Sequence, residues 1–210
     1  MVQVSSSIKK PKTSRGRKTR RKILDAAEIE FGAKGFHDGS ISGITRRAGV
    51  ALGTFYTYFE SKDAIFQAVV TDMSQRIREW IAERVANASD RLTAERLGIE
   101  AYIEFARRHK GIYRIISESE FVATAAYREH YEGFALGYRR NLEKAAQNGE
   151  IRSGDYEAWA WAIMGIAVFL GMRFVIMDES KSPSEIADIM TDLIANGIKP
   201  KKSPISGGAA

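Results

Sequence analysis

The sequence predicts an all-α fold, with a small N-terminal helical domain followed by a larger helical domain. Apolar residues recur at helical spacing along most of the 210 residues, without a convincing strand alternation. Glycines follow several apolar stretches where a helix would end. Positive charge gathers in the first segment: residues 1–62 hold 13 Lys or Arg against 5 Asp or Glu, and residues 63–210 hold 19 against 21. A basic block of this kind favours a polyanionic partner.

Composition excludes several classes of protein. The chain contains no cysteine, so disulfides, thiolate zinc sites and cysteine nucleophiles are excluded. The N-terminal residues are rich in Ser and Lys and lack the apolar core of a signal peptide. We expect a cytoplasmic protein that carries no cofactor and no metal.

The N-terminal segment is predicted to be a disordered basic arm followed by a helix. Residues 1–18 have few apolar side chains and six Lys or Arg, so they should be disordered. A helix is expected from Thr19 to Gly35, with an apolar stripe of Leu24, Ala27 and Phe31.

Two short helices are expected next. Ile41, Ile44 and Ala48 form one apolar stripe, and Gly49 stands where a helix-ending residue is needed. The following helix should run over about 52–59, with Phe55 and Phe59 turned inward.

The fourth helix should be long and should leave the basic domain. Ser61 is its expected N-cap, and Asp63 in its first turn complements the helix dipole. Further helices are expected at about 93–108, 111–119, 122–148, 156–178 and 184–196. The expected division is an arm (1–18), a helix-turn-helix domain (19–64), a ligand-binding and dimerisation domain (65–198) and a disordered tail (199–210).

One dense motif carries a family resemblance. The run Ala48-Gly49-Val50-x-x-Gly53-Thr54-Phe55-Tyr56-x-Tyr58-Phe59-x-Ser61-Lys62-Asp63 follows Ala26-Ala27-x-x-x-Phe31-x-x-x-Gly35-Phe36. Together they closely resemble the DNA-binding domain of the TetR family of transcriptional regulators. The resemblance covers about residues 19–66, roughly a quarter of the chain. The remainder is similar to the family only in being helical.

The resemblance implies which residues contact DNA. The segment 51–58 would be the recognition helix, with base edges contacted by Leu52, Gly53, Thr54 and Thr57. Phosphates would be held by Ser40, Tyr56, Tyr58 and Lys62. Ala51 and Leu52 depart from the family's usual serine and polar residue, so the third helix should lack a side-chain cap, and Leu52 should contact a thymine methyl.

The arm offers a further DNA contact. Arg15 and Arg17 flank Gly16, and such a tripeptide can lie in a narrow A·T-rich minor groove. Non-specific attraction to phosphates is the alternative, and we favour it slightly.

The second half of the chain is rich in aromatic residues. Thirteen of the 21 lie between Tyr102 and Phe174, and a stripe at helical spacing runs from Tyr127 to Leu142. Tyrosine hydroxyls suit a half-polar cavity wall, although plain core is an equal alternative. Candidate ligand-binding residues are Tyr102, Phe105, Tyr127, Tyr131, Phe134, Tyr138, Met164 and Arg173. For Arg173, a surface or interface salt bridge is favoured over a pocket role.

The segment from Ala158 to Met172 is uncharged over fifteen residues. It is too short to span a bilayer, so we expect no membrane association. A helix that is apolar on nearly all sides must be covered, and a second copy of the chain is the natural cover. This helix and the one from Ser184 to Asn196 would form a four-helix dimer interface, and the family resemblance implies the same arrangement.

These observations together predict a ligand-responsive DNA-binding regulator. We expect a repressor that binds a palindromic double-stranded operator as a homodimer and is released by a small apolar or amphipathic effector. An activator and a non-specific basic architectural protein are the alternatives. An enzyme is not expected: His37, His109 and His130 have no metal-type spacing, no phosphate loop or nucleophile elbow is present, and surface or helix-end positions are expected for all three.

Overall fold

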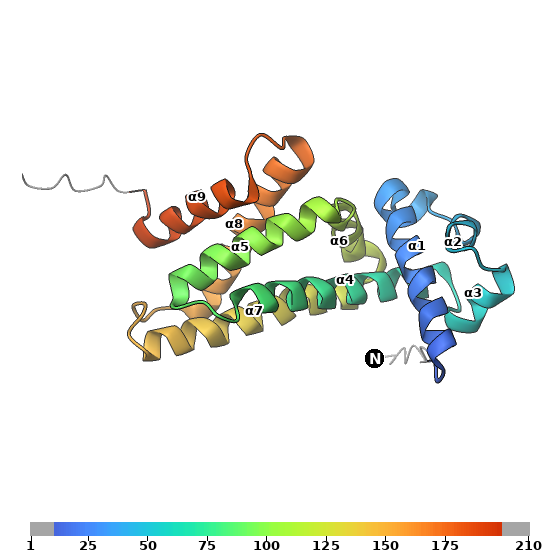
Figure 1. Cartoon of the computed structure of the whole chain (residues 1–210), viewed down its shortest axis with the longest axis horizontal. Helices are drawn as coiled ribbons and strands as arrows, with labels where there is room; N and C mark the ends of the chain where they lie inside the picture. The colour runs from blue at the N-terminus through green and yellow to red at the C-terminus, as the bar shows by residue number, and fades with distance from the viewer. Residues whose placement is uncertain (1–10, 199–210) are drawn as a thin grey trace, which may run out of the picture.

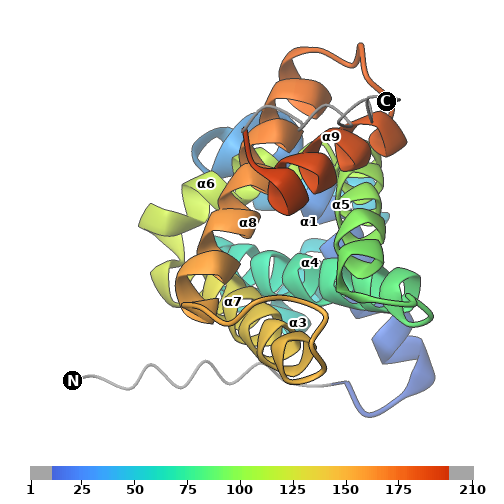
Figure 2. The ribbon, with the colours of Figure 1, turned by 90° about the vertical axis from the view of Figure 1, so that its left-hand side faces the viewer.

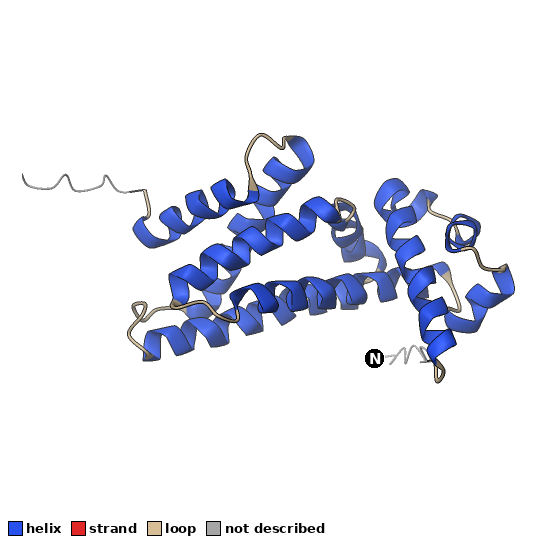
Figure 3. Cartoon of the chain, viewed as in Figure 1, coloured by secondary structure: helices blue, strands red, loops and turns tan. Residues whose placement is uncertain are grey.

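A computed structural model of the chain describes residues 11–198, and within that range all regular structure is helical (Figure 3). The all-α prediction is confirmed. The expectations for residues 1–10 and for the tail 199–210 lie outside the described residues. The elements are α1 (Ser14–Asp38), α2 (Ile41–Ala48), α3 (Leu52–Tyr58), α4 (Lys62–Val85), α5 (Arg91–Arg108), α6 (Ile112–Val122), α7 (Thr124–Gln147), α8 (Tyr156–Gly171), the π-helix η1 (Met172–Met177) and α9 (Pro183–Asn196).

The helices form an elongated molecule. Helices α1, α2 and α3 gather at one end, and α4 runs from there along the molecule (Figure 1). Helices α5, α6 and α7 pack on the rest of α4, and outside them α9 packs along α5 and α8 along α7 (Figures 1 and 2). Helix α6 contacts both α1 and α7, so it lies between the two ends.

Aromatic side chains fill the core of the α1–α3 end. Phe31, Phe55 and Phe66 are completely buried, and Phe31 meets Phe66 edge to face with ring centroids 5.1 Å apart. Phe59 is also buried, so the inward orientation expected for Phe55 and Phe59 is confirmed. Three short helices acquire a stable core here because large aromatic rings bury much apolar area per residue.

Helix ends follow the capping signals of the sequence. The Ser40 and Ser61 side chains accept hydrogen bonds from the third backbone N–H beyond each, at 3.0 Å. Gly49 ends α2 in the left-handed conformation with φ of 65°, where glycine has no Cβ penalty. Ser182 and Glu185 form the expected capping box of α9. Ala51 provides no side-chain cap to α3, as predicted.

Helix α1 begins earlier than the sequence indicated. The Thr13 hydroxyl accepts a hydrogen bond from the Gly16 N–H at 3.0 Å and so caps a helix that starts at Ser14, whereas Thr19 was the expected start. Residues 14–18 are therefore helical and not part of a disordered arm. The expected end at Gly35 is a real break, with φ of 80°, beyond which one more helical turn continues to Asp38.

Helix α8 continues directly into η1, so the helical segment extends beyond the uncharged stretch 158–172. The combined segment Tyr156–Met177 has 22 residues, a mean hydropathy of 2.0 and only 33% of its most apolar window buried. By length and composition this segment alone, among the described residues, could cross a membrane. The expectation that this helix is too short to span a bilayer was therefore wrong. It considered only the fifteen uncharged residues before Arg173, whereas the helix has 22 residues. A core helix of a globular protein meets the same criterion.

Candidate DNA-binding surface and ligand cavity

Helix α3 presents an exposed outer face. Leu52 and Tyr56 are large side chains that are 54% and 52% exposed, and Gly53 and Thr57 are exposed beside them. A Cβ placed on Gly53 would meet no atom within 4 Å, so the backbone here is open to an approaching surface. The arrangement is that of a helix able to enter a major groove.

The remaining predicted residues of α3 are partly covered. Thr54 and Tyr58 are half-buried, and the Tyr58 ring packs against the core near the first turn of α1. The Thr57 hydroxyl donates to the Gly53 carbonyl at 3.1 Å, which leaves its lone pairs as acceptors. Leu52, Gly53, Tyr56 and Thr57 thus form the accessible part of the predicted set.

The N-terminus of α2 lies on a buried carboxylate. Glu30 is 1% exposed, and a hydrogen bond from Lys34 at 2.8 Å is the main reason that its pKa is lowered. Its carboxylate also accepts from the Ser40 backbone. A Cβ on Gly43 would lie 2.2 Å from Glu30 Oε1, so a larger residue there would displace the Glu30 carboxylate. Glu30 therefore fixes where Ser40 and the start of α2 stand.

Lys62 has an internal partner that the sequence did not reveal. Its Nζ donates to the carbonyls of His37 and Gly39 at 3.0 and 3.1 Å, and it lies 4.5 Å from the centre of the Phe36 ring. The ammonium therefore holds the start of α4 on the turn that follows α1. The expected phosphate contact would have to use the remaining donor of this group.

Arg15 and Arg17 lie in the first turns of α1. Both are exposed, and Arg17 donates to the Lys12 carbonyl at 3.3 Å. An extended Arg-Gly-Arg segment lying in a minor groove is not the geometry seen, because these residues are helical. Exposed guanidinium groups at a helix start can still reach phosphates, which was the favoured alternative.

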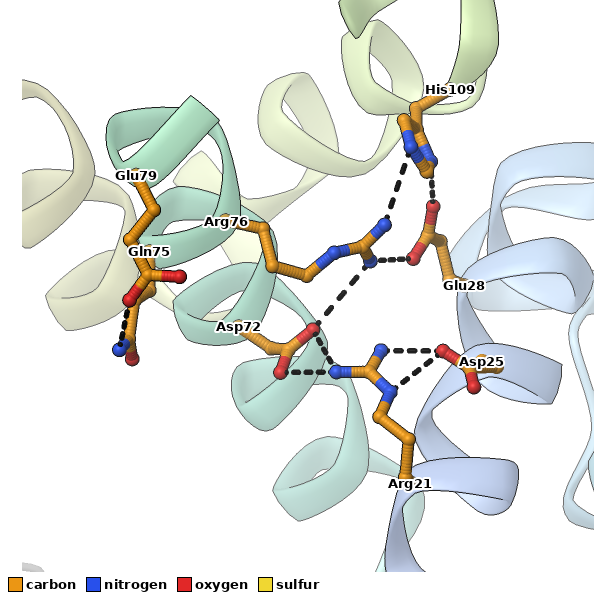
Figure 4. A network of polar contacts seen from close by, with 8 residues as sticks. All are labelled: Arg21, Asp25, Glu28, Asp72, Gln75, Arg76, Glu79 and His109. Atoms are coloured by element: carbon orange, nitrogen blue, oxygen red, sulfur yellow. Dashed lines mark hydrogen bonds and ion pairs between the residues drawn. The ribbon is translucent and has the colours of Figure 1, made fainter. Parts of the chain in front are cut away.

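A network of polar side chains joins α1 to α4 and α5 (Figure 4). Nη1 of Arg21 in α1 donates to both carboxylate oxygens of Asp72 in α4, at 2.6 and 2.8 Å. Arg76 of α4 donates to Glu28 of α1 at 2.6 Å, and His109 at the end of α5 contacts the same carboxylate at 2.6 Å. The network ties three helices together at the junction of the two ends.

Glu28 is the centre of this network. Burial alone would raise the pKa of Glu28, but the hydrogen bond from His109 and the charge of Arg76 outweigh it, so the pKa is lowered. Arg76 also contacts His109 Nε2 at 3.2 Å. Since arginine can only donate, Nε2 accepts and Nδ1 carries the proton donated to Glu28. His109 is the C-cap of α5 and His37 lies exposed in the last turn of α1, so both occupy the surface or helix-end positions expected of them.

Helix α6 contacts α1 more closely than a side chain would allow. A Cβ on Gly111 would lie 2.6 Å from the Cα of Gly32, so the two backbones nearly touch. Arg114 donates to the Ala33 carbonyl at 2.5 Å. Glu118 accepts from the backbone N–H of Phe36 at 2.5 Å. One face of α6 is thereby fixed to the end of α1.

The opposite face of α6 lines a cavity of about 250 Å³. Ile112, Tyr113, Ile116 and Ser117 come from α6, and Ile77 and Ile81 come from α4. The remaining lining residues come from α5, α7, α8 and the first residue of η1: Gly98, Ile99, Tyr102, His130, Tyr131, Phe134, Tyr138, Met164, Ala167, Val168, Phe169 and Met172. A mostly apolar hollow with a few polar groups is the usual form of a small-molecule site.

Two tyrosines in the cavity are hydrogen-bonded to each other. The Tyr102 and Tyr113 hydroxyls are 3.0 Å apart, and Tyr113 donates to the Val168 carbonyl at 3.4 Å. Burial raises the pKa of Tyr102 well above its usual range and raises the pKa of Tyr113 to about 12. Both phenols are therefore neutral at physiological pH.

His130 is a buried polar residue of the cavity wall. It is 8% exposed, its Nδ1 lies 2.7 Å from the Ser74 hydroxyl, and its ring meets Tyr131 and Phe134 edge to face. Burial, with a smaller contribution from the Arg78 charge, lowers the pKa of His130 to about 4. The expectation of a surface or helix-end position was wrong for His130, because it lies inside α7 on the face toward α4.

The structure brings together five of the eight predicted ligand-binding residues. Tyr102, Tyr131, Phe134, Tyr138 and Met164 line the cavity. The other three do not: Phe105 stacks on His109 at 4.4 Å, Tyr127 packs on Tyr131 one turn away, and Arg173 pairs with Asp178 at 3.2 Å. Arg173 thus makes the surface ion pair that the sequence favoured.

Several residues that line the cavity were not among those predicted from the sequence. Tyr113 and His130 provide polar groups, and both carried a usable signal, since a tyrosine or histidine on an apolar helix face needs a partner. Ile77 and Ile81 gave no such signal, because they continue the ordinary apolar stripe of the fourth helix.

Comparison with known proteins agrees with this geometry. The family model described as "Bacterial regulatory proteins, tetR family" matches residues 23–69. An uncharacterized HTH-type transcriptional regulator of Bacillus subtilis (strain 168), YdgC, is 29% identical over 197 residues, which cover 91% of this chain and 98% of the relative. Residues 23–69, which the family model matches, include most of α1, all of α2 and α3, and the first part of α4.

Solved structures show the same fold. The fatty acid degradation regulator FadR from Bacillus halodurans has a TM-score of 0.76 at 19% identity, covering 86% of this chain and 100% of that chain. FadR from Bacillus subtilis, solved in complex with stearoyl-CoA, has a TM-score of 0.74 at 22% identity over the same shares. The relatives are transcriptional regulators and not enzymes. Residues 23–69 thus carry the DNA-binding domain of the TetR family of transcriptional regulators, and nearly the whole chain is similar to an HTH-type transcriptional regulator.

Proposed function

We propose that this regulator is a cytoplasmic repressor that binds a palindromic operator as a homodimer and is released by a small, neutral, amphipathic effector. The observation that carries the effector part is the double role of α6, which contacts α1 on one face and lines the cavity on the other. DNA binding rests on the exposed face of α3 and on the basic N-terminal segment.

The roles at the DNA follow from exposure. Leu52 and Gly53 stand free at the start of α3, where a recognition helix contacts base edges, and Leu52 suits a thymine methyl. Tyr56 and the cap of α2 at Ser40 supply hydroxyl and N–H groups for phosphates. Few direct hydrogen bonds to bases remain, so the spacing between two copies must contribute to specificity.

The second copy of the chain would cover apolar side chains that α8, η1 and α9 leave exposed. The largest of these are Trp161, Phe169, Ile176, Met177, Ile189 and Leu193, with Phe169 at 67% and Met177 at 66% exposure. Large apolar side chains exposed on helices that contact one another suit an interaction site. A two-fold dimer also places two recognition helices about 34 Å apart, as successive major grooves require. Dimer burial is our preferred reason for the apolar character of Tyr156–Met177.

Effector binding would act on DNA binding through two helices. The expected route is α4, which lines the cavity through Ile77 and Ile81 and then enters the α1–α3 end. Helix α6 adds a second and shorter route, because Gly111 touches Gly32 directly. A ligand that fits the cavity better in one position of these helices would favour that position.

The size and polarity of the cavity favour a small neutral effector. Its 250 Å³ lies below the roughly 300–1,000 Å³ typical of sites for drug-sized ligands. The described lining residues include no Lys, Arg, Asp or Glu. Because FadR from Bacillus subtilis was solved with stearoyl-CoA, a long acyl compound is the second candidate.

Selection of bound sequences from random DNA tests the DNA-binding proposal. The wild type should select a palindrome. Tyr56→Phe should weaken binding to all sequences about fivefold through loss of one hydrogen bond, and Leu52→Gln should change the preferred base at one position of each half-site. Uniform binding that disappears at modest salt would contradict the proposal.

The dimer and effector parts are tested on the selected operator. Ile189→Glu should shift the sedimentation of the protein toward the monomer and abolish operator binding, whereas Ile29→Glu, exposed on α1, should leave the dimer intact. In vitro transcription from a promoter that overlaps the operator should be reduced by the protein and restored by cell extract. Restoration by stearoyl-CoA alone would support the second candidate.

A further inference from the structure

The geometry points to an effector that donates a hydrogen bond to Nε2 of His130, an alcohol, phenol or N–H compound and not an ether or an anion. This inference rests on the proposed effector role of the cavity and specifies the ligand chemistry of that same site. It is carried by the hydrogen bonds that fix the His130 ring.

Ser74 determines which nitrogen of His130 carries the proton. The Ser74 hydroxyl donates its single proton to the Val70 carbonyl at 2.7 Å. Towards Nδ1 of His130, 2.7 Å away, it can therefore only accept. Nδ1 carries a proton, and in the neutral ring Nε2 is an unprotonated acceptor.

The neutral ring is the state that the surroundings favour. His130 is almost completely buried between aromatic rings, and the guanidinium of Arg78 lies on the Phe134 ring, 5.6 Å from its centre. A second positive charge here would be poorly solvated and would repel Arg78. The pKa of His130, lowered to about 4, agrees with this.

The hydroxyl oxygen of Tyr102 is a second hydrogen-bond acceptor in the cavity. Because Tyr113 uses its proton on the Val168 carbonyl, the contact between the two hydroxyls is a donation from Tyr102 to Tyr113. The Tyr102 oxygen keeps its lone pairs for the cavity. His130 and Tyr102 thus both accept, while the described lining residues offer an anion no lysine or arginine. A buried acceptor that meets an ether or alkyl group is left unpaired, which costs affinity.

Three para-substituted benzenes of matched size test the inference. They are para-butylphenol, which donates a hydrogen bond, para-butylanisole, which can only accept, and para-butylbenzoate, which is an anion. Isothermal titration of the full-length protein at neutral pH should give about tenfold tighter binding for the phenol than for the anisole, corresponding to about 1.4 kcal/mol. The benzoate should bind more weakly than the phenol by a similar factor.

Two variants separate hydrogen-bond recognition from packing. His130→Phe keeps an aromatic ring but removes the acceptor, so the ratio of phenol to anisole affinity should fall to near one. Ser74→Ala keeps the imidazole but removes the acceptor for Nδ1, so the proton can move to Nε2 and the ratio should also fall. If His130→Phe fails to fold, Ser74→Ala still provides the test. Tyr127→Phe, which lies outside the cavity lining, should leave the ratio unchanged.

Each outcome has one meaning. Equal affinity for phenol and anisole, or tightest binding of the benzoate, overturns the inference and leaves the cavity as a ligand site. Unchanged ratios in both His130→Phe and Ser74→Ala overturn the assignment to His130. No binding of any of the three compounds to the wild type overturns the effector role of the cavity and the inference with it.

Discussion

The two ends of the molecule use aromatic residues in opposite ways. At the α1–α3 end, Phe31, Phe55 and Phe66 are completely buried, Phe31 packs edge to face on Phe66, and Phe55 packs on Phe59. At the other end, Tyr131 and Phe134 are half-buried around a cavity of about 250 Å³. In both places the residues repeat at helical spacing. Periodicity shows which face of a helix turns inward, but it does not show whether that face meets other side chains or empty space.

The difference also concerns polar groups. At the α1–α3 end, the carboxylates of Glu28 and Glu30 are satisfied by arginine, lysine, histidine or backbone donors. In the cavity, His130 and Tyr102 each keep an acceptor for a ligand. The polar groups of the α1–α3 end are paired as folded, whereas those of the cavity would be paired by the proposed effector.

Paired truncations should show the largest effect. Phe55→Ala removes a fully buried ring and should lower the free energy of unfolding by about 3–5 kcal/mol. Phe134→Ala enlarges a hollow that already exists and removes a half-buried ring, so about 1–2 kcal/mol is expected. Urea unfolding at one protein concentration measures both, since a dimer's apparent stability depends on concentration.

Equal losses in the two variants would contradict the comparison. They would mean that the cavity collapses around its aromatic residues in solution. The cavity end would then be packed as densely as the α1–α3 end.

Acidification should affect the cavity end through His130. Its pKa falls from about 6.5 in the unfolded chain to about 4 in the fold, so the unfolded state binds the proton more tightly. Stability from this group is fully present above pH 6.5 and is lost as pH falls through 4, a loss of about 3 kcal/mol. Denaturant unfolding between pH 7 and pH 4 measures it.

His130→Phe is the matched control for this prediction. Glu28 also has a lowered pKa and loses stabilisation on acidification in both proteins. The difference between wild type and variant therefore isolates the histidine. Parallel pH profiles would show that His130 is accessible to protons in the fold.

Two glycine substitutions test the contact between the ends, with the smallest expected effect. Gly111→Ala places a Cβ 2.6 Å from the Gly32 backbone and should cost about 1–3 kcal/mol and alter operator affinity. Gly137→Ala, in the middle of α7 with no atom within 4 Å, should be stabilising by up to about 1 kcal/mol. If Gly111→Ala resembles Gly137→Ala in thermal unfolding and gel shift, the contact of α1 and α6 carries no coupling.

Local signals in the sequence predicted most of the fold. Ser61, Ser182 and the glycines after α2, α7 and α9 set helix ends that the structure reproduces, because caps act through neighbouring backbone groups. The start of α1 was placed too late, because a basic composition concealed the Thr13 cap. The helix expected over 156–178 is reproduced by α8 and η1 together, but its length was not used when the uncharged part was judged too short to cross a membrane.

The candidate sites were less predictable, because they depend on contacts between distant residues. Phe105 and Arg173 lie on helices that line the cavity or adjoin it, but they face other neighbours. The proton position on His130 depends on Ser74, which is 56 residues away in the chain. Likewise the close approach of Gly43 to the Glu30 carboxylate arises across the contact between α1 and α2.

The internal partners of Lys62 have a thermodynamic consequence. Its ammonium holds the first residue of α4 to the carbonyls of His37 and Gly39, so a rotation of α4 carries the turn after α1 with it. In the proposed dimer, an effector would then alter the distance between two rigid units without altering how either one fits its half-site. Base changes within a half-site and effector binding should therefore have additive free energies, whereas changes in the spacer between half-sites should not.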